Sequence, residues 1–318
     1  MSFWISMHDR VEAYLDIRRS LGYALRVEGE ELKRFARFAE TQGHKSALTL
    51  DLALAWANAS QKASPVYRAR RLEIVRSLAK YCVLFEPETE IPPPGLLGSA
   101  HRRVTPHIYS QQELSDLLIT AEHLAPQDGL RPLTMKCFLG LLASTGLRVS
   151  EALRLTRKDV NFTDGVLTVW ETKFHKSRHV PLHHTAVEAL NEYAHFRDLR
   201  VPYSQTSCFF LLDDGQPFRY RQARSAFDQI RSQLGWESRH GRRPRLYDLR
   251  HTFACRRLQL WYEEGVNVDW ALPYLATYLG HGKVTDTFWY LTGVPSLMAI
   301  VSARFERLAC TGQEVRHE

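Results

Sequence analysis

The chain has 318 residues, of which 44% are hydrophobic and 24% are charged. That length suits two domains that each bury a core of their own, and this balance of residue types excludes disorder over most of the chain. The net charge of +7 and the pI of about 9.2 favour a polyanionic partner, chiefly nucleic acid.

The five cysteines are scattered along the chain, at Cys82, Cys137, Cys208, Cys255 and Cys310. Their odd number and wide spacing argue against a disulfide framework and a zinc ribbon, and free thiols fit a reducing compartment. Charged residues interrupt the N-terminal apolar run too early for a signal peptide, and no apolar stretch is long enough to span a membrane. We therefore expect a cytoplasmic protein without a membrane partner.

The first part of the chain carries the apolar spacing of helices. Residues spaced i, i+3, i+4 and i+7 predict helices near 7–20, 28–41 and 50–59, and a fourth after Pro65. Four short helices predict an all-α helical bundle over residues 1–92 as the first domain.

A segment rich in proline and glycine follows, with the sequence IPPPGLLGSAHRRVTP. We assign residues 93–106 to an interdomain linker on this composition. Helical signals then return, because Ser110 and Glu113 have the spacing of a capping box. A further helix is expected through PLTMKCFLGLLAST, ending near Gly146.

Strands are predicted clearly in one place. The segment NFTDGVLTVW contains Asp164-Gly165, a strong hairpin turn signal, followed by alternating residues up to Trp170. The segment SRHVPL at 177–182 is the expected returning strand, and the rest of the chain looks helical. The predicted fold is mainly α with a small antiparallel β-sheet, and residues 107–318 form an α+β second domain.

An arginine in a turn is the first candidate for chemistry. In STGLRVSEALRL, a helix is expected to end at Gly146, Arg148 lies in the turn, and Ser150 can cap the next helix. An arginine held between two helix ends can bind two phosphate oxygens. The alternative is a structural salt bridge, for which Glu151 is the nearest partner.

Two further motifs lie downstream. RLYDLRHTFA places Arg250 early in a predicted helix, with Tyr247 one turn before it. YLGHGKVTDTFWYL places His281 after a helix end at Gly280, and Tyr290 nine residues later. A tyrosine phenol is a poor nucleophile until another group shares its proton. Each motif alone also fits an ordinary basic helix or an aromatic core.

Taken together and in this order, the motifs TGLRVSEAL, YDLRHTFA and LGHGKVTDTFWY resemble the tyrosine recombinase (phage integrase) family. The resemblance covers residues from about 106 to 305, and the N-terminal helices look like the core-binding domain of the same family, a DNA-binding domain.

The resemblance implies a role for each matching residue. Arg148 and Arg250 would grip the scissile phosphate, and His281 would bind it as well. Tyr290 would be the nucleophile. Lys173, at the tip of the predicted hairpin in ETKFHKSRHVPL, would protonate the departing 5′-oxygen.

Lys176 is a less favoured candidate for that proton transfer, since Lys173 comes directly off the strand. Glu151 and Asp248 would orient neighbouring side chains. Tyr247 departs from the pattern, because the family usually has His three residues before the second arginine. A phenol can hydrogen-bond a phosphate oxygen or the nucleophile, but it is a poor base at neutral pH, so slower activity is expected.

This chemistry needs no metal and no cofactor, because positioning and charge stabilisation carry phosphoryl transfer and the phosphotyrosine conserves the bond energy. Four histidines near the hairpin leave a zinc site as an alternative to solvated or DNA-facing side chains: His175, His179, His183 and His184.

Two basic clusters are the expected contacts to the DNA backbone. They are RARR at 68–71 and RHGRRPR at 239–245, and the residues singled out are Arg68, Arg70, Arg71, Arg242 and Arg243.

The implied partner is double-stranded DNA, bound by a tetramer of this chain or by related recombinases of the same element. The segment TDTFWYLTGVPSL, which includes Tyr290, looks more like integrases of mobile elements than like chromosome-dimer resolvases. The segment 296–309 has an apolar stripe at helical spacing, and it is expected to dock on a neighbouring subunit or on its own domain. Two alternatives stay open: a DNA-relaxing topoisomerase of related chemistry, and a DNA-binding protein that has lost catalysis.

Overall fold

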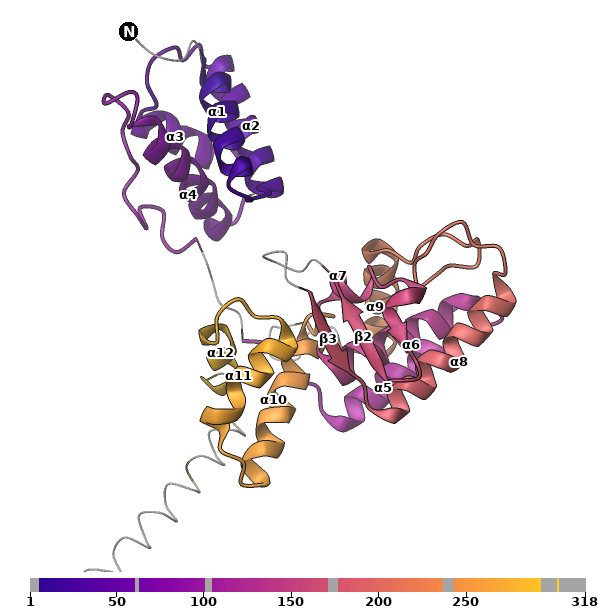
Figure 1. The fold of residues 1–318 in the computed structure, drawn as a ribbon. Helices are drawn as coiled ribbons and strands as arrows, with labels where there is room; N and C mark the ends of the chain where they lie inside the picture. The colour runs from indigo at the N-terminus through magenta and orange to yellow at the C-terminus, as the bar shows by residue number, and fades with distance from the viewer. Residues whose placement is uncertain are drawn as a thin grey trace, which may run out of the picture. The chain divides into compact units, whose positions relative to one another are not determined.

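The computed structural model describes residues 6–60, 63–100, 105–170, 177–236 and 243–292, together with Ser302. The chain divides into two compact units, Met1–Val104 and Thr105–Glu318 (Figure 1). Each unit has an apolar core of its own.

The first unit consists of the four helices that the apolar spacing predicted: α1 Met7–Ser20, α2 Arg26–Thr41, α3 Leu50–Asn58 and α4 Pro65–Cys82. Side-chain oxygens of Ser6, Thr49 and Ser64 accept the first free backbone N–H groups of α1, α3 and α4. The helix α2 begins two residues earlier than expected, after Leu25 in the left-handed conformation with φ 39°.

The core of the first unit also contains charged side chains. Arg10 is 1% exposed and forms two hydrogen bonds of 2.7 Å with Glu86, which ties α1 to the segment after α4. The guanidinium of Arg71 is 4% exposed and lies 3.6 Å from the ring centre of Trp56. This stacking inside the core occupies the guanidinium of Arg71 and argues against the predicted contact of Arg71 with DNA, which stays a prediction.

The second unit is mainly helical and carries the small sheet, so the predicted fold class is confirmed. Its elements are α5 Gln111–Glu122, α6 Leu130–Thr145, α7 Val149–Ala152, the 3-10 helix η1 Arg157–Asp159, β1 Val160–Asn161, β2 Val166–Val169, β3 Arg178–Pro181, α8 His184–Arg200, α9 Tyr220–Gln233, α10 Asp248–Glu263, α11 Val268–Leu279 and α12 Thr285–Thr292. The capping box of Ser110 and Glu113 is present at the start of α5.

The sheet has the strand order β1-β2-β3 with both pairs antiparallel, and Leu167 of β2 pairs with Val180 of β3. Gly165 takes φ 63° in the turn before β2, as the Asp-Gly signal predicted. The strand β3 contacts α11, and this contact brings the sheet to the candidate site (Figure 1).

Two apolar clusters fill the second unit. The larger is built around α6, where Phe138 packs edge-on against Phe210 and Phe218. The smaller joins α10, α11 and α12 and includes Leu272 and Tyr290. Over the described part of the chain, no helix combines the length and the apolar character that crossing a bilayer requires.

Candidate active site

Three backbone turns meet at the candidate site. They are the end of α6, the start of α10 and the end of α11. Gly146 and Gly280 cap α6 and α11 with φ of 62° and 69°, a conformation that favours glycine. A Cβ atom on Gly146 would lie 2.5 Å from Cδ1 of Phe253, so neighbouring side chains also exclude a larger residue there.

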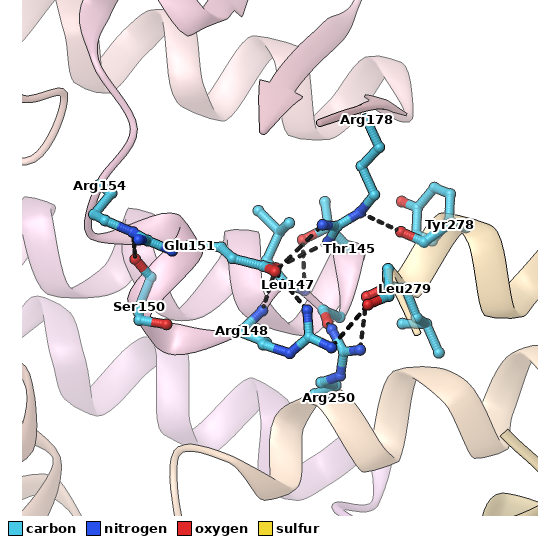
Figure 2. Close-up of polar contacts among 12 residues, drawn as sticks. Thr145, Leu147, Arg148, Ser150, Glu151, Arg154, Arg178, Arg250, Tyr278 and Leu279 are labelled. Carbon is cyan, nitrogen blue, oxygen red and sulfur yellow. Dashed lines mark hydrogen bonds and ion pairs between the residues drawn. The ribbon is translucent and has the colours of Figure 1, made fainter. Parts of the chain in front are cut away.

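Arg250 holds two of these turns together. Its guanidinium donates to the backbone oxygen of Gly146 at 2.8 Å and to that of Leu279 at 2.7 Å (Figure 2). The side chain is 1% exposed, and burial lowers its pKa, which the charge of nearby Tyr290 opposes. A guanidinium has more donors than these two bonds use, and Nε has no partner within the described structure. Arg250 thus presents unused donors next to Tyr290.

Arg148 also bonds the turn at the end of α11. Its Nη2 donates to the backbone oxygen of Gly280 at 2.9 Å, and its Nη1 donates to Oε1 of Glu151 at 2.6 Å. The salt bridge to Glu151, which the sequence left as an alternative, is therefore present. It does not occupy the whole guanidinium, whose side chain stays 25% exposed. Arg148 can bind both Glu151 and a further anion.

Glu151 is shared by two arginines. Arg178 of β3 donates to its two carboxylate oxygens, at 3.2 and 2.8 Å, beside the bond from Arg148 (Figure 2). Burial alone would raise the pKa of Glu151, but the hydrogen bonds and charges of Arg178 and Arg148 outweigh it and lower that pKa to about 2. The carboxylate is therefore ionised at neutral pH.

The expectation that Ser150 caps a helix is wrong. The short helix α7 begins after Arg148, and the carboxylate of Glu151 accepts the backbone N–H of Arg148 at 3.0 Å. Ser150 lies inside α7, where its backbone oxygen accepts from Nε of Arg154 at 3.1 Å (Figure 2).

Tyr290 lies between two imidazole rings. The ring of His281 stacks on it at a centroid distance of 5.9 Å, and the ring of His251 meets it at 5.3 Å and 62°. Tyr290 is 4% exposed, and burial raises the pKa of its phenol, which the charge of Arg250 opposes. The phenol is protonated at neutral pH, so it must lose a proton when it attacks.

Burial lowers the pKa of His251 to about 4. Burial, followed by the charges of neighbouring arginines, also lowers the pKa of His281 to about 4. Both imidazoles are therefore neutral at pH 7. His281 Nδ1 lies 2.7 Å from the hydroxyl of buried Thr287. If that hydroxyl donates, Nε2 carries the ring proton and can donate to a phosphate oxygen.

Two further residues of the motif flank the site. Tyr247 is 46% exposed, and its ring meets that of His251 at 4.9 Å. Asp248 is buried and accepts two side-chain bonds from Arg245, at 2.7 and 3.2 Å, together with the Arg245 backbone N–H. It therefore fixes the residues that lead into α10, and its role in orienting the catalytic groups stays a prediction.

The structure brings four of the predicted residues together: Arg148, Arg250, His281 and Tyr290. Lys173, Lys176, His175 and Arg242 lie outside the described residues. Arg70 and Arg243 are exposed, and Arg68 is half-buried. In the described ranges, no group of three or more His, Cys, Asp and Glu side chains is arranged to hold a metal ion.

Arg178 and His251 belong to the site and were not predicted. The sequence offers little to find Arg178, since a single arginine on a strand has no characteristic spacing. His251 follows Arg250 directly, and its burial against Tyr290 depends on how α10 packs on α12.

Comparison with known proteins agrees with this geometry. The sequence profile described as the Phage integrase family matches residues 109–293, more than half of the chain. Two proteins of Sinorhizobium fredii (strain NBRC 101917 / NGR234) named as integrase/recombinase are similar over most of their length. For y4rE the identity is 37% over 93% of this chain and 94% of the relative, and for y4rB it is 38% over 93% and 96%.

Solved structures share the fold. The integrase of transposon Tn1549, in complex with a circular intermediate DNA, matches with a TM-score of 0.71 and 16% identity, over 96% of this chain and 100% of that one. The XerH site-specific recombinase bound to its palindromic difH substrate matches with a TM-score of 0.64 and 17% identity, over 88% and 79%.

The family profile covers Arg148, Arg250 and His281 and ends at residue 293, just after Tyr290. The chain belongs to the phage integrase family and is a tyrosine recombinase.

Proposed function

We propose that this chain cleaves and rejoins duplex DNA through a 3′-phosphotyrosine formed at Tyr290. One observation carries the proposal: a buried phenol lies between two imidazoles and beside the guanidinium of Arg250. Arg148 is bonded to the turn that precedes His281, so a second cation belongs to the same cluster. A cationic pocket of this kind attracts a phosphodiester and stabilises the charge on its oxygens as the phenol attacks.

In the proposed cleavage step, the phenolic oxygen of Tyr290 bonds to phosphorus while the bond from phosphorus to the 5′-oxygen breaks. The 3′-phosphate stays on the tyrosine. The phenol proton passes to the neutral imidazole of His251, which borders its ring, while His281 donates to a phosphate oxygen. The departing 5′-oxygen takes a proton from Lys173. Rejoining runs through the same bonds in reverse.

Tyr247 occupies the position where the family usually has His. Its exposed hydroxyl is available to donate to a phosphate oxygen, while the neutral imidazoles of His251 and His281 are better proton acceptors than a phenol. We assign Tyr247 to phosphate binding and not to proton transfer.

The proposed substrate is double-stranded DNA, held by both units and cut within a tetramer on two sites. The Tn1549 integrase and XerH were solved on DNA, which supports a duplex as the partner. We further propose a role in the integration or transposition of a mobile element, on the likeness to y4rE, y4rB and the Tn1549 integrase.

A suicide substrate tests the proposal. It is a nicked duplex from the DNA beside the gene, whose small 5′ fragment diffuses away after cleavage and traps the adduct. Wild type should form a denaturant-resistant DNA adduct, and Tyr290→Phe should bind the DNA and form none. Tyr274→Phe, the same change on an exposed residue of α11, is the matched control.

An adduct formed by Tyr290→Phe would show that another residue is the nucleophile. Relaxation of supercoiled DNA without a specific site would favour the topoisomerase alternative instead.

A further inference from the structure

Arg178 connects three parts of the candidate site. It is the first residue of β3 and lies five residues after Lys173 in the sequence. Its Nε donates to the backbone oxygen of Tyr278 at 2.8 Å, and its other two nitrogens donate to Glu151 at 3.2 and 2.8 Å (Figure 2). A Cβ atom on Gly280 would lie 2.6 Å from Nη1 of Arg178, so the guanidinium lies directly against the backbone that leads to His281.

The geometry separates the roles of the two arginines on Glu151. Arg178 is 10% exposed and all three of its nitrogens have partners, whereas Arg148 is 25% exposed. Arg148 is therefore the arginine that can reach a phosphate. Arg178 is enclosed and acts on other protein groups.

Because Arg178 shares the Glu151 carboxylate, fewer donors of the Arg148 guanidinium are used by Glu151. With Arg178 in place, Glu151 distributes its two oxygens over both guanidinium groups and the backbone N–H of Arg148. Without Arg178, the ionised carboxylate would be compensated by Arg148 alone, and a buried charge takes all the donors within reach. Arg148 would then turn toward Glu151, and the net positive charge of the site would fall by one.

We propose that Arg178 is a positioning residue of the recombinase: it shares Glu151 with Arg148 and holds the Tyr278–Gly280 end of α11, so that Arg148 and His281 face the scissile phosphate together. This inference rests on the proposed function, and nothing in the motifs that define the site points to Arg178.

The test is the replacement Arg178→Met, which keeps the length of the side chain and removes its charge and donors. Arg178→Lys keeps the charge and part of the hydrogen bonding. Arg154→Met is the matched control. Arg154 is an exposed arginine three residues after Glu151, and among the described contacts its Nε bonds only the Ser150 backbone oxygen (Figure 2). Each protein is assayed for DNA binding, thermal melting and adduct formation on a suicide substrate.

Three substrates distinguish the possible origins of a defect. The first has the natural phosphodiester. The second has a neutral methylphosphonate at the scissile position, which reduces the need for arginine charge. The third has a 5′-bridging phosphorothiolate, whose thiolate leaves without a proton from Lys173.

We expect Arg178→Met to bind DNA within about twofold of wild type and to cleave the phosphodiester roughly 10- to 100-fold more slowly, the range seen when a partner that orients a functional ligand is removed. The methylphosphonate should restore most of the rate and the phosphorothiolate should not. Arg178→Lys should lie between wild type and Arg178→Met, and Arg154→Met should match wild type. If Arg178→Met does not fold, the Lys variant on the same substrates decides.

Rescue by the phosphorothiolate would overturn the proposal, since the defect would then be in Lys173. A slow variant that neither substrate rescues, with a lowered melting temperature, would also overturn it and make Arg178 a structural residue only. Failure of the wild type to form any tyrosine adduct is a different result, which would refute the proposed function.

Discussion

At the scale of single residues, the imidazoles beside Tyr290 set the protonation of the site. Burial lowers the pKa of both His251 and His281 to about 4, so each ring is neutral at pH 7 and able to accept a proton. The charges of Arg250 and Arg148 act in the same direction on His281. Arginine clustering that favours a phosphate thus also keeps the neighbouring base unprotonated.

Because these pKa values are lowered by folding, the free energy of unfolding should depend on pH. The unfolded chain binds protons on its histidines near pH 6.5, while folded His251 does so near pH 4, so stability is complete above pH 6.5 and is lost as the pH falls toward 4. From pH 7 to pH 5 the loss from His251 is on the order of 1–2 kcal/mol. Urea unfolding of His251→Phe should show a smaller loss over that interval, with exposed His195→Phe as the control. An unchanged pH dependence in His251→Phe would contradict the burial argument.

Replacing Arg148 or Arg250 should reduce DNA cleavage more than DNA binding. Their donors matter most as negative charge builds on the phosphate oxygens in the transition state. We expect Arg148→Ala to reduce adduct formation by roughly 10²- to 10³-fold and to weaken DNA binding far less. Single-turnover cleavage and fluorescence anisotropy measure the two quantities, with Arg224→Ala on α9 as a surface control.

Arg250→Lys is the better probe of the second arginine, because truncation to Ala would leave the buried oxygens of Gly146 and Leu279 without a donor. Equal losses in cleavage and binding would make both arginines simple binding residues.

The motifs predicted Arg148 and His281 just after helix ends that glycine marks in the sequence, and Arg250 early in a helix. The burial of Arg71 could not be predicted, since RARR has the composition of a solvated surface and its stacking depends on Trp56 from another helix. The sharing of Glu151 with Arg178 was missed for the same reason: the partner lies 27 residues away, on a strand.

At the scale of elements, the turn between α6 and α7 connects the two arginines of the site. The backbone oxygen of Gly146 accepts a hydrogen bond from Arg250, and Arg148 lies two residues further along the chain. The longer helices were predictable from apolar spacing, and the hairpin from its Asp-Gly turn. The helix α7 has four residues, too few for any periodicity, which is why Ser150 was misassigned as a cap.

Gly146→Ala should destabilise this turn. The left-handed conformation costs a residue with a side chain about 1–2 kcal/mol, and the Cβ atom would also meet Phe253 at 2.5 Å. We expect a lower melting temperature together with slower cleavage, because the anchor of Arg250 shifts. Gly140→Ala, in the middle of α6 with its nearest atom at 4.0 Å, should be neutral or stabilising by up to about 1 kcal/mol. Equal stability of the two variants would show that the turn tolerates a side chain.

At the scale of the whole molecule, the chain is divided into two units with separate cores, and this division should affect its affinity for DNA. The core of residues 1–104 is built from α1 to α4, and that of residues 105–318 from α6 and its neighbours. The boundary between the units, after Val104, lies within the segment 91–106, which is rich in proline and glycine. Leu97 of that segment packs against the first core, so part of it belongs to the first unit.

Two units on one chain should bind one duplex more tightly than either unit alone. Once one unit is bound, the linker keeps the other at a high effective concentration, which raises the affinity by roughly 10²- to 10⁴-fold without any new contact. We expect fragments 1–104 and 105–318 each to melt cooperatively and each to bind the duplex weakly at a fixed salt concentration. An equimolar mixture of the two should not recover the affinity of the full chain, because the gain comes from the covalent connection. Fragment 105–318 binding as tightly as the full chain would instead place the whole DNA-binding surface in the second unit and leave the four-helix unit with another task.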